Sequence, residues 1–353
     1  TGSGTQTFSA NVTTTGNQTY TAAGGITSSG ARTFTSNSGT VNFASALAGN
    51  NNNLTVSGAA DIDGAVTNIA VLSITGASNI SANITSSGTQ TYGGAVTLSA
   101  NTTLTTSSDI VTFSNTVNSA DSTNRNLTVT TGGNTVHINF DGIVGEGEGL
   151  GAIAITGVLD LNAAIADANS LTVSGVSLLD ANVTTSGNQT YSAAITLGTA
   201  ARTLAGSTIQ TVAVGGAQNL TITGNLDLNG AITQVAVFAV SGTTDLGANV
   251  TTTGTQTYSG AVTISGSTVT RTLTTSADTI TFSNTLNSSA SAGNHLTFGS
   301  NTGTATFTGA VGGATNGTLG TITNIASQTL IFSDAVTATT IANMSLIYLT
   351  RPS

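Results

Sequence analysis

The sequence contains no cysteine, no lysine, no tryptophan and a single proline among its 353 residues. The absence of cysteine excludes a disulfide scaffold, a thiolate metal site and a thiol nucleophile. Only 5% of the residues are charged, against roughly 25% in a typical soluble domain. Five arginines and fourteen acids leave a formal charge of -9. This balance argues against a nucleic-acid partner, because neutralising phosphates requires clustered basic side chains.

Long apolar runs are also missing from the chain. None approaches the roughly 20 residues of a membrane-spanning helix, so we expect a protein that does not span a membrane. The 38% of hydrophobic residues and the low charge are unlike a disordered chain. Threonine, serine, asparagine and glycine replace most of the usual charged residues, which predicts a folded protein with a surface rich in hydroxyl and amide groups. The first residues, TGSGTQTF, already follow the repeat pattern. We therefore expect that a leader was removed or that the chain belongs to a longer protein.

One stretch of eleven residues is present four times with few changes. The copies are ANVTTTGNQTY, ANITSSGTQTY, ANVTTSGNQTY and ANVTTTGTQTY, which begin at Ala10, Ala82, Ala181 and Ala248. They divide the chain into repeat units 10–81, 82–180, 181–247 and 248–353. Other segments recur in the same order within these units, so we expect residues 1–353 to form one continuous repeat domain.

Short alternations of apolar and polar residues dominate within the units, as in Leu54/Val56 and Leu171/Val173. A period of two is typical of strands with one buried face. Successive buried pairs lie about 16–22 residues apart, whereas an antiparallel sandwich would have strands every 8–12 residues or so. The spacing favours coils of two or three short strands stacked on one another. The prediction is an all-β fold, a right-handed parallel β-helix (β-solenoid) with about 16–22 residues per coil.

The motif G-[NT]-Q-T-[YF] carries four of the five tyrosines. Its Gln and Tyr are two residues apart and so lie on one face of a strand. Exposed rings would suit sugar binding, whereas buried rings would fill the coil while the Gln bonds to backbone at a corner. The copies recur every 67–99 residues rather than in every coil, which favours the structural interpretation. The residues concerned are Gln18, Tyr20, Gln90, Tyr92, Gln189, Tyr191, Gln256 and Tyr258.

Arginine also follows the repeat. Arg32, Arg202 and Arg271 occupy one position of the R-T-[FL] segment. We expect a turn position at which the guanidinium pairs with backbone carbonyls or a nearby aspartate.

Asp61 and Asp63 resemble the paired carboxylates that a β-helical polysaccharide hydrolase uses for acid–base chemistry. The aligned positions in other units are Asp160/Asn162 and Asp227/Asn229. Because a catalytic pair should occur once, we expect outward surface residues here. No catalytic residue is predicted, and we expect a protein that is not an enzyme.

Glu146 and Glu148, in VGEGEGLG, are the only glutamate pair and the only weak candidates for a calcium site. Further oxygen ligands at fixed spacing are lacking around them. His137 and His295 have no partner at metal-ligand spacing, so no metal and no cofactor are expected. An ice-binding face would need T-x-T at one position of every coil. TTT and TLTT occur only once per unit, which does not favour it.

The run from Leu226 to Ile264, LDLNGAI…VSG…LGANVTTTGTQTYSGAVTI, resembles the degenerate repeats of very large bacterial exoproteins. These are the filamentous-haemagglutinin-like adhesins and related β-strand-repeat surface proteins, and the similarity extends from Gly4 to about Val336. The resemblance implies a long right-handed β-helical shaft that is secreted across a bacterial outer membrane and displayed on the cell surface. Neither the N-terminal secretion domain nor the C-terminal membrane barrel of such proteins is recognisable in this sequence.

The expected function is a structural shaft segment of a secreted surface adhesin, a stiff and protease-resistant extracellular rod that serves adhesion or biofilm. Its expected partners are other copies of itself or the remainder of a longer exoprotein, together with host or matrix surface ligands. One alternative is a self-assembling extracellular fibre or sheath subunit that stacks end to end. The other is a β-helical polysaccharide hydrolase or lyase, which requires a unique cluster of Asp, Arg or Lys that the sequence does not show.

Overall fold

The computed structural model describes residues 4–290, 293–300, 302–314, 317–325, 328–342 and 346–349. All regular secondary structure in these residues is β-strand, and the strands pair in parallel over about 16 turns. The predicted all-β parallel β-solenoid is thereby confirmed. The chain divides into two compact units, residues 1–187 (unit 1) and 188–353 (unit 2). That all four repeat units form one continuous solenoid stays a prediction.

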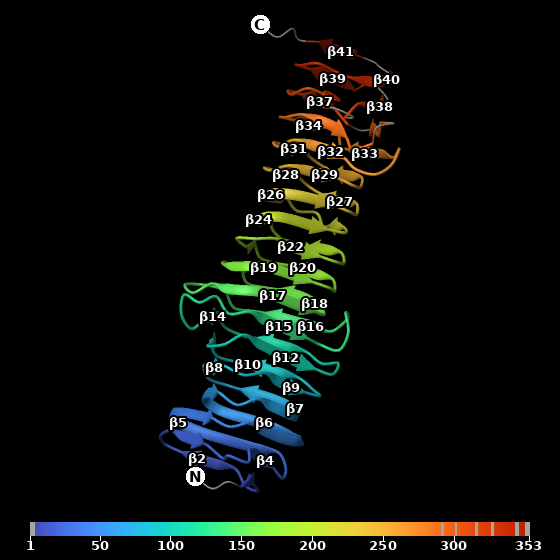
Figure 1. Cartoon of the computed structure of the whole chain (residues 1–353). Helices are drawn as coiled ribbons and strands as arrows, with labels where there is room; N and C mark the ends of the chain where they lie inside the picture. The colour runs from blue at the N-terminus through green and yellow to red at the C-terminus, as the bar shows by residue number, and fades with distance from the viewer. Residues whose placement is uncertain are drawn as a thin grey trace. The chain divides into compact units, whose positions relative to one another are not determined.

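Most strands are three or four residues long, because each is one straight segment between two corners of a coil (Figure 1). The strands of unit 1 are β1(Gln6–Phe8), β2(Val12–Thr14), β3(Gln18–Tyr20), β4(Ile26–Ser28), β5(Arg32–Phe43), β6(Leu47–Ile62), β7(Val66–Ile74), β8(Ser78–Ile80), β9(Ile84–Ser86), β10(Gln90–Tyr92), β11(Val96–Leu98), β12(Thr102–Thr106), β13(Val111–Phe113), β14(Val117–Ser119), β15(Leu127–Thr130), β16(His137–Phe140), β17(Leu150–Thr156), β18(Val158–Leu161), β19(Ala168–Val173), β20(Ser177–Leu179) and β21(Val183–Thr184).

Unit 2 is built in the same way. Its strands are β22(Gln189–Tyr191), β23(Ile195–Leu197), β24(Arg202–Thr211), β25(Val214–Gly215), β26(Leu220–Leu228), β27(Ile232–Val235), β28(Phe238–Val240), β29(Thr244–Leu246), β30(Val250–Thr252), β31(Gln256–Tyr258), β32(Val262–Ile264), β33(Thr270–Thr274), β34(Thr279–Phe282), β35(Leu286–Ser288), β36(His295–Phe298), β37(Thr304–Phe307), β38(Leu319–Asn324), β39(Thr329–Phe332), β40(Ala338–Ala342) and β41(Leu346–Leu349).

The strands of unit 1 form three parallel stacks, one for each side of the coil. Stack 1A contains β1, β4, the starts of β6 and β7, β9, β12, β15, β17 and β19. Stack 1B contains β2, the start of β5, the middle of β6, the end of β7, β10, β13, β16, β18 and β20. Stack 1C contains β3, the ends of β5 and β6, β8, β11 and β14, and continues through bridges at Val144 and Ile165 to Val183.

Unit 2 has the same three-sided plan. Stack 2A contains β22, the ends of β24 and β26, β29, β32 and β35, and continues through bridges at Val311 and Val336. Stack 2B contains β23, β25, β27, β30, β33, β36, β38 and β40. Stack 2C contains the starts of β24 and β26, β28, β31, β34, β37, β39 and β41.

The register gives the length of each coil directly, as the interval between two paired residues. Leu54 pairs with Leu72, and Leu72 pairs with Gln90, so these two coils are equal in length and lie within the predicted range. Longer coils also occur, because loops are inserted at corners without disturbing the stacks. The coil from Val111 to its partner Ile138 and the coil from Ile280 to its partner Ala305 both exceed the predicted range.

The core is the interior of the coil, filled by alternate residues of every strand. Buried leucine, isoleucine and valine alternate with outward threonine, serine and asparagine, as the sequence pattern predicts. In stack 1B the rings of Tyr92, Phe113 and Phe140 lie one above another. Their centroids are 5.2 and 4.9 Å apart and their planes are tilted by 12° and 9°. These separations match the strand spacing of about 4.8 Å, so one ring per coil packs on the next.

Glycine is required where corners of successive coils meet. A Cβ on Gly94 would lie 2.4 Å from the carbonyl carbon of Gly76, and one on Gly76 would lie 2.5 Å from that of Gly58. No side chain fits at such distances. This close approach explains the glycine that precedes each strand of the GAV type.

Candidate functional site

The eleven-residue repeat forms a corner that is held together by its own polar side chains. The second residue of the repeat is an asparagine. The Oδ1 of this asparagine accepts a hydrogen bond from a backbone N–H one coil further along the chain. The pairs are Thr33 N to Asn11 at 3.0 Å, Thr103 N to Asn83 at 2.8 Å and Thr272 N to Asn249 at 2.9 Å. Each asparagine therefore ties its own coil to the next.

A hydroxyl three residues after the asparagine closes the turn itself. The Oγ donates to the carbonyl of the glycine two residues on, a local turn that serine and threonine form readily. The donors are Thr14 (2.6 Å), Ser86 (2.6 Å), Thr185 (2.9 Å) and Thr252 (2.6 Å). The sharp bend before each Gln-Thr-Tyr strand thus carries its own hydrogen bond.

The Gln and Tyr of the motif form a buried pair inside the coil. In the second copy, Tyr92 Oη donates to Gln90 Oε1 at 2.9 Å, and Gln90 Nε2 donates to the Thr105 carbonyl of the next coil at 2.9 Å. Both side chains are 0% exposed. The Tyr–Gln distance is 2.6 Å for Tyr20–Gln18, 3.0 Å for Tyr191–Gln189 and 3.1 Å for Tyr258–Gln256. Gln18, Gln189 and Gln256 also donate to a carbonyl of the following coil.

This geometry explains why the eleven-residue stretch recurs along the chain. The ring fills the coil, its hydroxyl is satisfied by the Gln two residues earlier, and the Gln reaches a backbone carbonyl that a corner leaves open. The four tyrosine rings of the motif are buried, so none of them is exposed for a sugar. Sequence reasoning did not single out the asparagine or the hydroxyl residue, although both recur at fixed spacing in all four copies.

We expect Gln90→Leu to lower the free energy of unfolding by about 2–4 kcal/mol, because the Tyr92 hydroxyl and the Thr105 carbonyl lose their buried partner. The double variant Gln90→Leu/Tyr92→Phe removes one orphaned group and should regain about 1 kcal/mol. Denaturant titration of both variants measures these differences. The outward Thr91→Val in the same strand serves as control, with an expected change within about 0.5 kcal/mol. A double variant that is no more stable than Gln90→Leu alone would contradict the buried pair.

The tyrosines also predict a response to pH. Burial raises the pKa of Tyr92, Tyr191 and Tyr258 far above the ordinary value, and it raises the pKa of Tyr20 as well. The unfolded chain loses these protons near pH 10 and the folded chain keeps them, so stability is complete below about pH 10 and falls as the pH rises further. Tyrosinate absorbance should therefore rise together with loss of the β-sheet circular dichroism. Ionisation of these tyrosines near pH 10 in a still folded protein would be the contrary result.

Copies of the motif do not lie on top of one another. In unit 1, four turns from Gln18 end at Val96, six residues past Gln90. In unit 2, four turns from Gln189 end at Val262, six residues past Gln256. The second copy in each unit therefore comes one stack short of completing a turn.

The three repeated arginines donate hydrogen bonds to backbone carbonyl groups at corners of the coils. Arg32 Nε donates to the Phe8 carbonyl at 3.2 Å, and Arg271 Nε donates to the Leu246 carbonyl at 3.3 Å. Both carbonyls end a strand of the preceding coil. Arg202 is 7% exposed and donates through Nη1 to the Ala201 carbonyl at 2.9 Å. Burial lowers the pKa of Arg271, and the charge of Asp245 opposes that shift.

Asp61 and Asp63 are linked to asparagines of neighbouring coils. Asn42 Nδ2 donates to Asp61 Oδ2 at 2.6 Å and to Asp63 Oδ2 at 2.9 Å. Asn79 Nδ2 donates to Asp61 Oδ1 at 2.9 Å, and Ser81 Oγ donates to Asp63 Oδ1 at 2.9 Å. Asn42, Asp61 and Asn79 are register partners on the outside of stack 1C. The carboxylates therefore join three coils on the surface.

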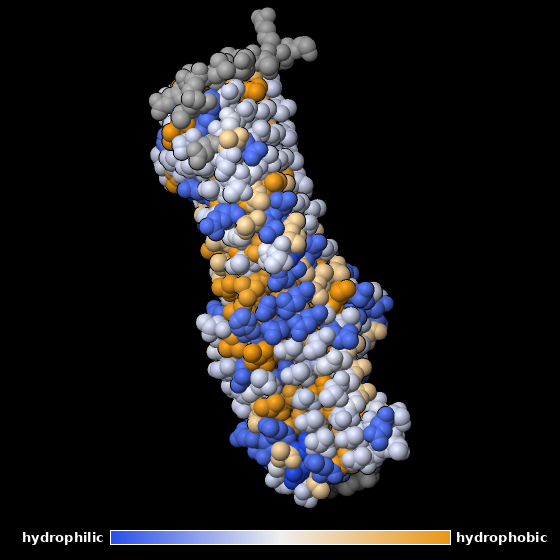
Figure 2. Space-filling model, turned by 180° about the vertical axis from the view of Figure 1, so that it is seen from behind, coloured by the Kyte–Doolittle hydropathy of each residue, from blue (hydrophilic) through white to orange (hydrophobic). Residues whose placement is uncertain are grey.

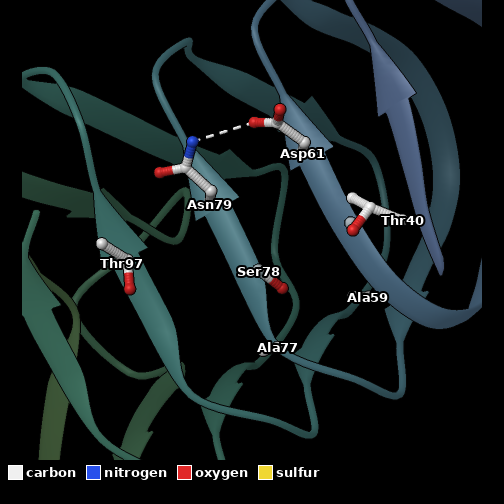
Figure 3. A pocket seen from close by; sticks show the side chains of 8 residues that line it. Thr40, Ala59, Asp61, Ala77, Ser78, Asn79 and Thr97 are labelled. Atoms are coloured by element: carbon white, nitrogen blue, oxygen red, sulfur yellow. Dashed lines mark hydrogen bonds between the residues drawn. The ribbon is translucent and has the colours of Figure 1, made fainter. Parts of the chain in front are cut away.

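A shallow pocket of about 290 Å³ lies beside Asp61 and Asn79. Figure 3 shows Asp61 and Asn79 side by side on adjacent strands, joined by their hydrogen bond, with Thr97 on the next strand. Ala59 and Ala77, which have small side chains, line the hollow. Asp61 is the one ionisable residue among those that line the pocket.

The repeat places a similar hollow in unit 2. It has a volume of about 260 Å³ and is lined by Thr243, Thr244, Asp245, Ala261 and Thr263. In the aligned repeat, Asp245 occupies the position of Asn79, and Thr263 that of Thr97. The two pockets therefore recur with the repeat, as structural features do.

Glu146 and Glu148 lie in the exposed loop between Val144 and β17. The described part of the chain contains no group of three or more His, Asp or Glu side chains placed to hold a metal ion. His137 Nδ1 lies 3.5 Å from Asp160 Oδ2, and His295 Nδ1 accepts the backbone N–H of Thr321 at 2.7 Å. The histidines thus have local partners on the coil.

Threonine, serine and asparagine take most of the outward strand positions. In Figure 2 the visible side is mostly of intermediate hydropathy, with scattered blue and orange areas. The described residues include no helix that is long and apolar enough to cross a membrane.

The stacks and the repeated corner define the protein as a parallel β-solenoid built from sequence repeats. Comparison with protein-family models finds no match, and comparisons with curated proteins and with solved structures find none either.

Proposed function

We propose that the chain is a structural shaft segment of a secreted bacterial surface exoprotein of the filamentous-haemagglutinin-like kind. Its function is mechanical: it forms a stiff, protease-resistant extracellular rod that serves adhesion or biofilm. The proposal combines the solenoid fold with the resemblance of the repeats.

The observation that carries the proposal is the continuity of hydrogen bonding from coil to coil. In unit 1 the backbone ladders of all three stacks pass through every coil, and the Gln–Tyr corners add side-chain bonds between coils. Strands inside such a stack have no free edge, so local opening requires breaking several bonds together. This architecture supports a role in which resistance to deformation matters.

Two further features support an extracellular role. Cysteine is absent, and the chain offers only five arginines and no lysine to trypsin-like proteases. The partners that we propose are the remainder of a longer exoprotein, further copies of the chain, and host or matrix ligands.

Negative-stain electron microscopy of the purified chain tests the proposal, together with digestion by proteinase K. Discrete straight rods that stay intact under digestion would support a shaft. Long filaments would support the alternative of a self-assembling fibre subunit. Round particles, or rapid cleavage throughout the strands, would contradict both proposals.

A further inference from the structure

Unit 2 carries a regular array of hydroxyl side chains on the outside of stack 2C. Three successive coils have a threonine or serine at every outward position around strands β31, β34 and β37. We call these nine residues the hydroxyl grid. They are Thr255, Thr257 and Ser259, then Thr279, Thr281 and Ser283, then Thr304, Thr306 and Thr308.

The rows of the grid are in register. Thr257 pairs with Thr281, which pairs with Thr306, and Thr279 pairs with Thr304. At the far column the ladder continues, since Ser283 N donates to the Tyr258 carbonyl and Thr308 N to the Phe282 carbonyl, both at 2.9 Å. Strand geometry places the hydroxyls about 4.8 Å apart between coils and about 6.6 Å apart along a strand. The grid is thus periodic in two directions.

The grid lies over a stack of nearly parallel rings. Beneath it, Tyr258, Phe282 and Phe307 stack with centroids 5.0 Å apart, and their planes are tilted by only 9° and 3°. Ordinary sheets twist by about 20–25° from strand to strand. The three rings beneath the grid are turned far less than this relative to one another.

The hydroxyls of the grid are available to solvent. Within the described residues, none of the nine donates or accepts a side-chain hydrogen bond to another protein group. Ser259, Ser283 and Thr308 are exposed, and the other six residues of the grid are partly exposed. Seven of the nine residues are threonine, whose χ1 is restricted, so their hydroxyls and methyls lose little entropy when they are held in place.

We propose that the hydroxyl grid binds ice. The two spacings are comparable with the oxygen–oxygen repeats on a prism face of ice, so hydroxyls take lattice positions while methyls order the water between them. The grid has no charged residue, which suits an uncharged crystal surface. Crystalline polysaccharide is less suitable as a ligand, because the aromatic rings that would stack on sugars are buried beneath the grid.

The array is hidden in the sequence because the coils differ in length. Gln256 pairs with Ile280 and Ile280 pairs with Ala305, and these two intervals along the chain are not equal. TQT, TIT and TAT thus fall at unequal intervals, yet they stack in one column. The inference goes beyond a shaft function and does not depend on it.

Growth of ice from a dilute solution of the full chain tests the proposal, with the ratio of protein in ice to protein in liquid as readout. The wild type should be enriched in ice relative to serum albumin. Thr281→Tyr at the centre of the grid, and Thr306→Lys beside it, should reduce the ratio to that of albumin. Thr196→Tyr is the matched control, because Thr196 points outward from β23 in stack 2B and should keep the wild-type ratio.

Circular dichroism and the unfolding midpoint establish that each variant is folded. Exclusion of the wild type from ice would overturn the proposal, and so would wild-type enrichment of both folded grid variants. Loss of enrichment in Thr196→Tyr would also overturn it, since the effect would not be specific to the grid. Binding to microcrystalline cellulose that Thr281→Tyr abolishes, without enrichment in ice, would assign the grid to polysaccharide instead.

Discussion

Replacing Leu171 with aspartate is expected to unfold the coils around it. Leu171 is 1% exposed and points into the coil from β19, where it pairs with Ile153 of the preceding coil. A carboxylate at this position has no buried partner, so we expect a loss of at least about 4 kcal/mol. In a solenoid each repeat contacts only its neighbours, and new proteinase K cleavages should therefore cluster near residue 171. Mass spectrometry of the fragments locates them.

The matched control for Leu171→Asp is Asp160→Asn. Asp160 lies on the outside of β18, where its carboxylate is 3.5 Å from His137 Nδ1 and partly exposed. Exposed ion pairs contribute little, so we expect a change within about 0.5 kcal/mol and no new cleavage site. If Asp160→Asn were more damaging than Leu171→Asp, the assignment of inward and outward residues would be wrong.

Replacing Phe113 with alanine is expected to have the second largest effect. Its ring lies between those of Tyr92 and Phe140 and is 0% exposed. Alanine leaves a cavity across one whole coil and interrupts the aromatic stack. Large-to-small changes of this kind cost about 3–5 kcal/mol, which thermal or denaturant unfolding measures.

Two further substitutions serve as controls for Phe113→Ala. Phe113→Leu keeps most of the volume and should cost less than about 1.5 kcal/mol. Phe8→Ala removes a ring that is only half-buried at β1, and it should be milder than Phe113→Ala. Equal losses for Phe113→Ala and Phe8→Ala would contradict the larger contribution expected of the fully buried ring.

The fold is predictable because the signals that define it are local. Alternation such as Leu171/Val173 marks strands, and the glycine at corners such as Gly94 marks where each strand ends. The buried Gln and Tyr are predictable for a similar reason, since their spacing of two residues puts them on one face.

The partners of these residues are not predictable from local signals. Gln90 bonds to Thr105, and Asn83 bonds to Thr103, each about one coil away. Coil length varies with the loops inserted at corners, as between Val111 and Ile138, so the residue that lies above another depends on every loop between them. For this reason the hydroxyl grid is invisible until the register is known.

The offset between motif copies has a consequence for the evolution of such chains. In unit 1 and in unit 2, the second copy falls one side short of whole turns from the first. Duplicating or deleting one repeat by recombination would therefore turn the azimuth of everything downstream by a third of a revolution, and three such events would restore it. The number of repeats would thus determine the direction in which the surfaces of later coils point.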